Sequence, residues 1–199
     1  IRPLVRASKD DEQLRAWVAG CSTGEEAYSI AMLFIEAFDR EGVRPDLKIF
    51  ATDVNEQGVE FAAAGRYPES AAVELGEERM KRFFTRDGRG LLVRPELRQS
   101  IVFARHNLLT DPPFTRMHLV TCRNTLIYFR RPAQDQALRR LQYALRQRGA
   151  LLLGPSESLT DQTSGMETLD AKHKLFLRIA PTMPAPLGLT GSHARTGRH

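Results

Sequence analysis

The stretch LRAWVAGCSTGEEAYSIAMLFIEAF, residues 14 to 38, constrains the fold more than any other part of the chain. Its first six residues are largely apolar and predict a buried strand. Small residues follow, and from Glu25 onward apolar side chains recur at helical spacing: Ala27, Ile30, Ala31, Phe34, Ile35 and Phe38. A buried strand that turns directly into an amphipathic helix is typical of α/β proteins.

The same alternation continues along the chain. A second strand is expected at 47–53, and Asn55 is placed to cap a helix that runs to Ala64. Gly42 and Pro45 are expected to end the first helix. Further elements are predicted as strands at 100–107, 118–122, 150–155 and 174–180, with a helix from Pro132 to Arg148. Strand, helix, strand and helix in this order predict a parallel sheet with right-handed crossovers.

Two segments depart from this alternation. Residues 67–99 combine a helical pattern with turn signals inside a short apolar run, and they predict an inserted subdomain with a hairpin. Residues 181–199 are rich in Pro, Gly and Arg and poor in large apolar side chains, which indicates a disordered tail or linker. The catalytic domain is therefore expected to span residues 1–180.

Composition restricts the class of protein. The chain has 199 residues, of which 42% are apolar and 27% charged, as suits one globular domain. No apolar run approaches the length of about 20 residues that spans a bilayer, and the N-terminus does not resemble a secretory signal. Two cysteines form no disulfide framework or zinc set, so a cytoplasmic location is expected. The net charge of +5 permits an acidic partner, or it reflects a solvated basic surface.

The loop between the first strand and helix carries unusual charges for a nucleotide site. Gly20 and Gly24 are spaced GxxxG, which is neither a dinucleotide fingerprint nor a P-loop. Glu25 and Glu26 would repel a pyrophosphate but would attract a cation. Asp53, which ends the second predicted strand, suits a ribose diol. A cationic nucleoside without phosphate fits both features, and S-adenosylmethionine is such a molecule. The alternatives are that the glutamates stabilise a helix N-terminus and that Asp53 caps a helix.

Several motifs together resemble the CheR-type chemoreceptor glutamate methyltransferases. They are WVAGCSTGEEAYSIAM, IFATDVN, GRYPES, RFFTR, CRNTLIYF and LLLGPSESL, and they extend over about residues 15–179. The motifs RYPES, DPPF and GPSESL are most similar to the form found in hybrid signalling proteins that also contain methylesterase and sensor domains. The resemblance implies a Rossmann-like S-adenosylmethionine-dependent methyltransferase fold, with a mostly parallel sheet and helices on both faces.

The resemblance also implies an activity and its residues. It implies methyl transfer from S-adenosylmethionine to glutamate side chains on the cytoplasmic helices of a chemoreceptor, leaving S-adenosylhomocysteine. Gly20, Glu25 and Asp53 would bind the cofactor, with Glu25 at the methionine end and Asp53 at the ribose. The remaining implied positions are Asn107 and Leu108 beside the adenine, Arg123 and Asn124 where donor and acceptor meet, and Tyr128 to orient the transfer. Arg123 and Tyr128 are thus the expected catalytic residues, and no metal ion is expected.

Three departures from the family pattern qualify these expectations. The family's N-terminal helical domain, which closes over the cofactor, is expected to precede residue 1 in a longer chain. The predicted hairpin turn RDGRG (86–90) is short, as in members that are not tethered to a receptor's C-terminal peptide, so tethering is not expected. Pro155 replaces a histidine of free-standing members, as in the hybrid forms.

Two other functions remain open from the sequence. A nucleic-acid methyltransferase is suggested by DPPF (111–114), but this motif precedes the strand it would have to follow. The other open function is a non-catalytic cofactor-binding module of a larger signalling protein.

A glutamate acceptor is already ionised at neutral pH, because its reference pKa is about 4.3, so no general base is needed. His106 and His118 are accordingly expected to pack or to face solvent.

Overall fold

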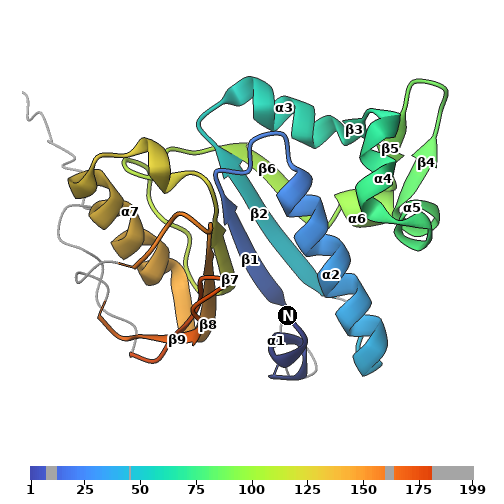
Figure 1. The fold of residues 1–199 in the computed structure, drawn as a ribbon. Helices are drawn as coiled ribbons and strands as arrows, with labels where there is room; N and C mark the ends of the chain where they lie inside the picture. The colour runs from blue at the N-terminus through green and yellow to red at the C-terminus, as the bar shows by residue number, and fades with distance from the viewer. Residues whose placement is uncertain (8–12, 45, 160–163, 181–199) are drawn as a thin grey trace, which may run out of the picture.

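The computed structural model describes residues 1–7, 13–44, 46–159 and 164–180. Pro45 and the predicted tail at 181–199 lie outside these ranges. The described chain forms a large sheet with helices against it and a smaller sheet set to one side (Figure 1). None of the helices in this part of the chain is long and apolar enough to cross a membrane.

Seven strands form the large sheet in the order β6-β2-β1-β7-β8-β10-β9. Their bounds are Leu14–Ala19 (β1), Leu47–Asp53 (β2), Ile101–Arg105 (β6), Met117–Cys122 (β7), Leu145–Leu153 (β8), Met166–Asp170 (β9) and Leu175–Arg178 (β10). The strands β6, β2, β1, β7 and β8 are parallel, and β10 runs antiparallel to both of its neighbours. The mostly parallel sheet expected from the sequence is confirmed.

The chain reverses its direction of travel across the sheet at β1. It runs outward from β1 through β2 to β6, and then returns to the other side of β1 as β7. Ala16 pairs with Ile49 of β2 on one side and with Leu119 of β7 on the other. In open α/β sheets, ligands bind beyond the carboxyl ends of the strands at such a switch point. The topology therefore directs attention to the loops that follow β1, β2, β6 and β7.

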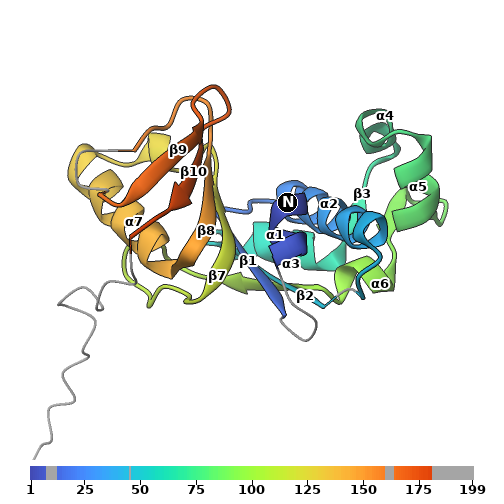
Figure 2. The ribbon, with the colours of Figure 1, turned by 90° about the horizontal axis from the view of Figure 1, so that it is seen from below.

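Alternation along β1 divides the core between the two faces of the sheet. Leu14, Ala16 and Val18 belong to the apolar cluster of helix α2 (Glu25–Glu41), whereas Trp17 and Ala19 belong to that of α7 (Arg131–Ala144). Helices α2 and α3 (Glu56–Ala64) both pack against β2 and β6, and α7 packs against β7 and β8 (Figures 1 and 2). Helices thus cover both faces, as expected. A short helix α1 (Arg2–Ala7) packs against α2.

The inserted segment forms its own small sheet, in the order β3-β5-β4. Its elements are β3 (Arg66–Tyr67), the 3-10 turn η1 (Glu69–Ala71), α4 (Ala72–Leu75), α5 (Glu77–Phe83), β4 (Phe84–Arg86), β5 (Leu91–Val93) and α6 (Pro95–Arg98). The hairpin between β4 and β5 was expected, but the predicted helix is divided in two at Gly76, whose φ is 76°. Figure 1 places this subdomain at the far end of the molecule from α7.

The structure corrects the sequence prediction at the C-terminal end of the fold. The helix that was expected to reach Arg148 ends at Ala144, and β8 begins at Leu145 rather than at residue 150. The guanidinium of Arg178 donates to the carbonyl oxygens of Gln142 and Leu145 at 2.7 and 2.6 Å, so these carbonyl groups are satisfied without a further helical turn. Strand β9 was not expected, because it is an exposed edge strand without a buried face.

Candidate functional site

Four loops meet at the carboxyl ends of the central strands and enclose a cavity of about 770 Å³. The lining residues come from 19–26 after β1, 52–54 after β2, 106–109 after β6, and 123–129 after β7. Each of these segments contains residues that the family resemblance assigned to the site. Every predicted site residue lines this cavity: Gly20, Glu25, Asp53, Asn107, Leu108, Arg123, Asn124 and Tyr128. A volume of this size is typical of a small-molecule site.

Glycine is required in the loop after β1 because the loop is tightly packed. Gly20 has a φ of 76°, and its backbone N–H donates to the carbonyl of Thr52 at 2.8 Å. A Cβ at Gly20 would stand 2.0 Å from the Thr125 hydroxyl oxygen, so no larger residue fits. Gly24, at φ 92°, precedes the first turn of α2. The loop therefore brings the backbone of β1 against the segment that follows β7.

Asp53 holds this loop to the end of β2. Its Oδ2 accepts the N–H of Ser22 at 2.9 Å, and its Oδ1 accepts the N–H of Asn55 at 2.9 Å. Asn55, rather than Asp53, caps helix α3, by accepting the N–H of Gly58 at 3.3 Å. Since a carboxylate has about four acceptor positions, Asp53 retains two for hydroxyl groups in the cavity.

Glu25 and Glu26 differ in their surroundings. The carboxylate of Glu25 is exposed and accepts the hydroxyl of Thr23 at 2.7 Å. The carboxylate of Glu26 accepts the hydroxyl of Thr121 at 2.6 Å and lies 3.5 Å from Nη1 of Arg123. Glu25 is thus available to a ligand, whereas Glu26 orients Arg123. The sequence identified Glu26 only as part of an acidic pair.

The loop after β6 is built by Asn107, and its other walls are apolar or aromatic. The N–H of Asn107 donates to Asp111 at 2.8 Å, which lowers the pKa of that carboxyl, while its Oδ1 accepts the N–H of Leu109 at 2.9 Å. Leu108 is buried. The ring of His106 contacts that of Trp17 edge-on with centroids 5.5 Å apart, and its Nε2 is 3.0 Å from the carbonyl of Pro112. The packing role expected of His106 is confirmed, and the residue also lines the cavity.

The segment after β7 lines the cavity beside the loop after β1, because β7 is a neighbour of β1 in the sheet. Asn124 adopts a left-handed conformation with φ 56°, and the 3-10 turn η2 (Leu126–Tyr128) follows. The side chain of Tyr128 is 82% exposed and stands at the rim of the cavity. Backbone N–H groups of this segment donate to the buried carboxylate of Glu157, a residue that the sequence analysis did not single out. In the sequence, Glu157 is marked only by its place in the motif GPSESL.

The two cysteines are buried residues of the sheet. Cys21 and Cys122 follow and end the neighbouring strands β1 and β7, and both are buried. Burial raises the pKa of the Cys21 thiol to about 12, with the charge of Asp53 adding to the effect, and it raises that of Cys122 also. Both thiols therefore stay protonated at neutral pH and are poor nucleophiles. Within the described ranges, no cluster of three or more His, Cys, Asp or Glu side chains could hold a metal ion.

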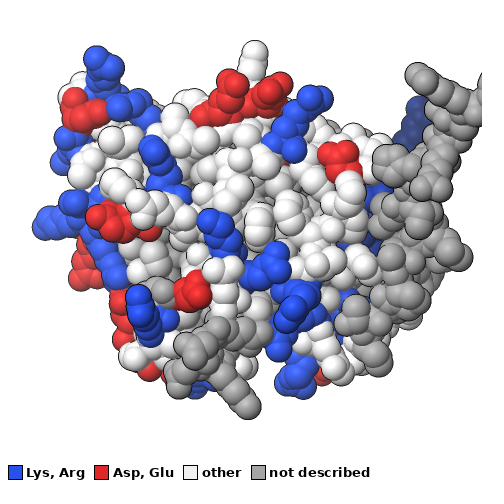
Figure 3. Space-filling model, turned by 180° about the vertical axis from the view of Figure 1, so that it is seen from behind, with Lys and Arg blue, Asp and Glu red and all other residues white. Residues whose placement is uncertain are grey.

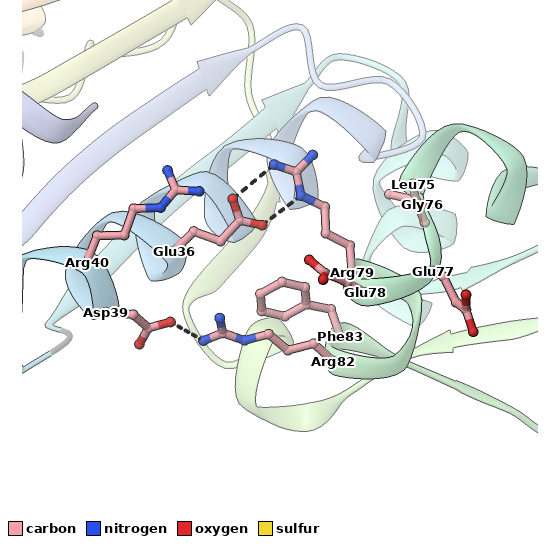
Figure 4. A pocket seen from close by; sticks show the side chains of 10 residues that line it. All are labelled: Glu36, Asp39, Arg40, Leu75, Gly76, Glu77, Glu78, Arg79, Arg82 and Phe83. Atoms are coloured by element: carbon pink, nitrogen blue, oxygen red, sulfur yellow. Dashed lines mark hydrogen bonds and ion pairs between the residues drawn. The ribbon is translucent and has the colours of Figure 1, made fainter.

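A second hollow, of about 500 Å³, lies between α2 and α5, away from the strand ends. Figure 4 shows two ion pairs across it: Glu36 accepts Nε and Nη2 of Arg79 at 2.7 and 2.9 Å, and Asp39 is 2.5 Å from Arg82. Each of these two arginines is neutralised by the facing helix. The hollow is therefore a salt-bridged seam between the inserted subdomain and the sheet domain.

Acidic and basic side chains are both present on the surface near the strand ends. Figure 3 shows a group of acidic side chains at the centre of the upper edge with basic side chains to either side, and further basic side chains through the lower centre. Within the cavity, the three carboxylates of Glu25, Glu26 and Asp53 outnumber the one guanidinium of Arg123, which suits a cationic ligand. The groups that S-adenosylmethionine presents fit this cavity: Glu25 for an ammonium, Asp53 for ribose hydroxyls, and Leu108 with aromatic neighbours for a base.

Comparison with known proteins agrees with this geometry. The family model described as "CheR methyltransferase, SAM binding domain" matches residues 1–175. A 104.1 kDa protein of Rhodobacter capsulatus is 55% identical over 181 residues, which are 91% of this chain but 19% of that protein. The chemotaxis protein methyltransferase of Listeria monocytogenes is 36% identical over 159 residues, covering 79% of this chain and 59% of its own length.

The chain therefore spans about a fifth of the first relative and just under three fifths of the second. Among solved structures, the N-methyltransferase NodS from Bradyrhizobium japonicum, in complex with S-adenosylhomocysteine, superposes with a TM-score of 0.45 at 15% identity. That superposition covers 75% of this chain and 55% of NodS. The family match over most of the chain is decisive: this chain belongs to the CheR methyltransferases, as their S-adenosylmethionine-binding domain.

Proposed function

We propose that the chain transfers a methyl group to glutamate side chains of chemoreceptor-type signalling proteins, forming glutamyl methyl esters. The observation that carries this proposal is that one cavity has an acidic wall, formed by Glu25 and Asp53, and is also lined by Arg123 and Tyr128. The relatives named as chemotaxis protein methyltransferases support it.

The acidic wall would bind the cofactor. Asp53 would accept the ribose hydroxyls through its remaining acceptor positions, and Glu25 would pair with the ammonium group. Asn107 fixes the turn that places Leu108 in the cavity, so its role toward the adenine is one of positioning. When bound, S-adenosylmethionine supplies an electrophilic methyl group.

Arg123 and Tyr128 would receive the acceptor. One carboxylate oxygen of the acceptor would take the methyl group to form the ester, and S-adenosylmethionine would leave as S-adenosylhomocysteine with the electron pair of the former carbon–sulfur bond on sulfur. No proton moves in this step, because the acceptor carboxylate is already ionised at neutral pH. Arg123 attracts the anion and Tyr128 would hold its second oxygen, so that the reacting atoms approach to about 3–3.5 Å. The ion pair with Glu26 would hold the Arg123 guanidinium in position until the acceptor binds.

The two alternatives are less well supported. In the DPPF motif, Phe114 stacks on Phe50 at 4.8 Å and the Pro112 carbonyl contacts His106, so the motif serves as packing rather than facing a flipped base. A cofactor-binding module without catalysis would have no need of the ion pair by which Glu26 positions Arg123. The proposal extends to a cytoplasmic location, to untethered action on a receptor and to a hybrid signalling protein as the context. The 104.1 kDa relative is much longer than this chain, as such a context requires.

The test is the chemical lability of the product. The chain is incubated with S-adenosylmethionine labelled on its methyl group and with the cytoplasmic fragment of a chemoreceptor. Base should release the label as volatile methanol, because only an ester is cleaved. Label that resists base would contradict a carboxylate acceptor. Binding of S-adenosylhomocysteine without any labelled acceptor would favour the non-catalytic module.

A further inference from the structure

We propose that Glu157 is a positioning residue for methyl transfer. It would fix residues 123–128, here called the Arg123 loop, in the shape that receives the acceptor carboxylate. This inference rests on the proposed function of the same cavity, and it assigns a role to a residue that does not line that cavity.

The carboxylate of Glu157 gathers four backbone N–H groups. Its Oε1 accepts those of Thr125 and Leu126 at 2.9 and 2.7 Å. Its Oε2 accepts those of Asn124 and Gly154 at 3.2 and 2.7 Å. Three of the four donors are consecutive residues of the Arg123 loop. Consecutive N–H groups that converge on one point form an anion-binding nest, and here the anion is supplied by the chain itself.

The burial of Glu157 restricts which residues and backbone angles are compatible with this arrangement. Glu157 is only 4% exposed, so its charge is stabilised by these N–H groups rather than by water. A Cβ at Gly154 would lie 2.8 Å from Oε2 of Glu157 and 2.9 Å from the N of Asn124, so only glycine allows the approach. Asn124 is held at a φ of 56°, a conformation that most side chains avoid. The nest thus maintains a backbone shape that the loop would not adopt alone.

The shape that Glu157 imposes reaches the cavity directly. Thr125 donates its hydroxyl to the carbonyl of Arg123 at 3.2 Å and packs against Gly20. The N–H of Tyr128 donates to the carbonyl of Thr125 at 3.3 Å, which starts the turn that presents the tyrosine at the rim. Asp53 and Asn107 make their loop contacts with other partners. Disturbing Glu157 should therefore affect the acceptor side more than the cofactor side.

Glu157→Gln is the sharpest substitution, because it keeps the shape and replaces one acceptor oxygen with an NH₂ donor. Two of the four backbone N–H groups would then face another donor. Asp170→Asn is the matched control: it alters a carboxylate that accepts the N–H of His173 at 2.9 Å, in the turn after β9. Glu157→Asp keeps the charge but withdraws it by one methylene, and it carries the test if the glutamine variant does not fold.

Three measurements on the full chain decide the matter. In Glu157→Gln, hydrogen exchange of the N–H groups of residues 124–126 should accelerate about tenfold or more, and turnover should fall about tenfold or more. The Kd for S-adenosylhomocysteine should stay within about threefold, since the contacts of Asp53 persist. Glu157→Asp should show smaller changes of the same kind, and Asp170→Asn none.

Wild-type exchange or wild-type turnover in the Glu157 variants would overturn the proposal. So would a loss of S-adenosylhomocysteine affinity equal to the loss of turnover, because that would indicate a general structural role. A wild-type chain that esterifies no acceptor would contradict the proposed function instead. Hydrogen exchange at residues 124–126 would then still show whether Glu157 fixes the loop.

Discussion

The Asp53 carboxylate and the Ser22 backbone N–H are joined by a hydrogen bond of 2.9 Å, which links the end of β2 to the glycine loop after β1. The same carboxylate also accepts the N–H of Asn55, the cap of α3. One side chain thus shapes the loop and presents its remaining acceptor positions to the cavity. Cofactor binding and loop shape should for this reason respond together to changes at Asp53.

Tyr128→Phe should separate chemistry from cofactor binding. The hydroxyl stands at the rim on an 82% exposed side chain, so its removal leaves no buried void. Loss of a hydrogen bond to a carboxylate, worth about 1.5–3 kcal/mol, should reduce turnover about tenfold or more. The Kd for S-adenosylhomocysteine, measured by calorimetry, should not change. Equal losses of turnover and affinity would refute this division of roles.

Glu25→Gln and Glu26→Gln form a matched pair on one helical turn. Glu25→Gln should weaken S-adenosylhomocysteine binding about tenfold, because an ammonium loses a charged partner. Glu26→Gln should mainly lower turnover, since it releases Arg123 from its ion pair. Calorimetry and initial rates distinguish the two effects. The reverse pattern would show that Glu26 is the cofactor's carboxylate.

Comparison of Gly20→Ala with Gly42→Ala tests whether glycine is required at position 20 because of the contact with Thr125 or only because of the positive φ. Both residues have a positive φ, of 76° and 66°. A Cβ at Gly42 meets nothing within 4 Å, so its alanine variant should lose only about 1–2 kcal/mol of stability. A Cβ at Gly20 collides with Thr125, so that variant should also lose S-adenosylhomocysteine binding. Normal binding by Gly20→Ala would contradict the observed packing.

Glu36 should make the seam between α2 and α5 sensitive to acid. Hydrogen bonding from Arg79 lowers the pKa of Glu36 in the folded state, so the unfolded chain binds its proton more readily. The stability from this pair is present above the usual glutamate pKa of about 4.3 and is lost as pH falls through the lower folded value.

Glu36→Gln should therefore be less stable than wild type at neutral pH by about 0.2–1 kcal/mol, because the pair is partly exposed. The two proteins should converge in stability as the pH falls below about 4. Urea unfolding over that pH range measures both quantities. Parallel curves with a constant difference would show that the Arg79 pair does not set the acid response.

Local patterns in the sequence were sufficient for the central strands, whereas most of the expected site residues came from the resemblance to a family. β2 was predicted to the residue, and Asn55 caps α3 as expected, because both depend on neighbouring residues. The topology of parallel strands then brought Gly20, Asp53, Asn107 and Arg123 to one cavity.

Contacts between distant residues could not be predicted in the same way. The end of α7 depends on Arg178, which follows it by more than thirty residues. The role of Glu157 depends on N–H groups of a loop that precedes it by a similar distance. The exposed strand β9 lacks the periodicity that identifies a strand. In each case the deciding interaction is tertiary and leaves no local pattern.

The most direct test of the cofactor site is titration of S-adenosylhomocysteine into Asp53→Ala, with Asp46→Ala as the control at the other end of β2, where Asp46 pairs with Gln13. Asp53→Ala should bind about tenfold more weakly or worse, because the ribose and the loop both lose a charged acceptor, and Asp46→Ala should bind as wild type does. Wild-type affinity in Asp53→Ala would remove that carboxylate from the site and contradict the account.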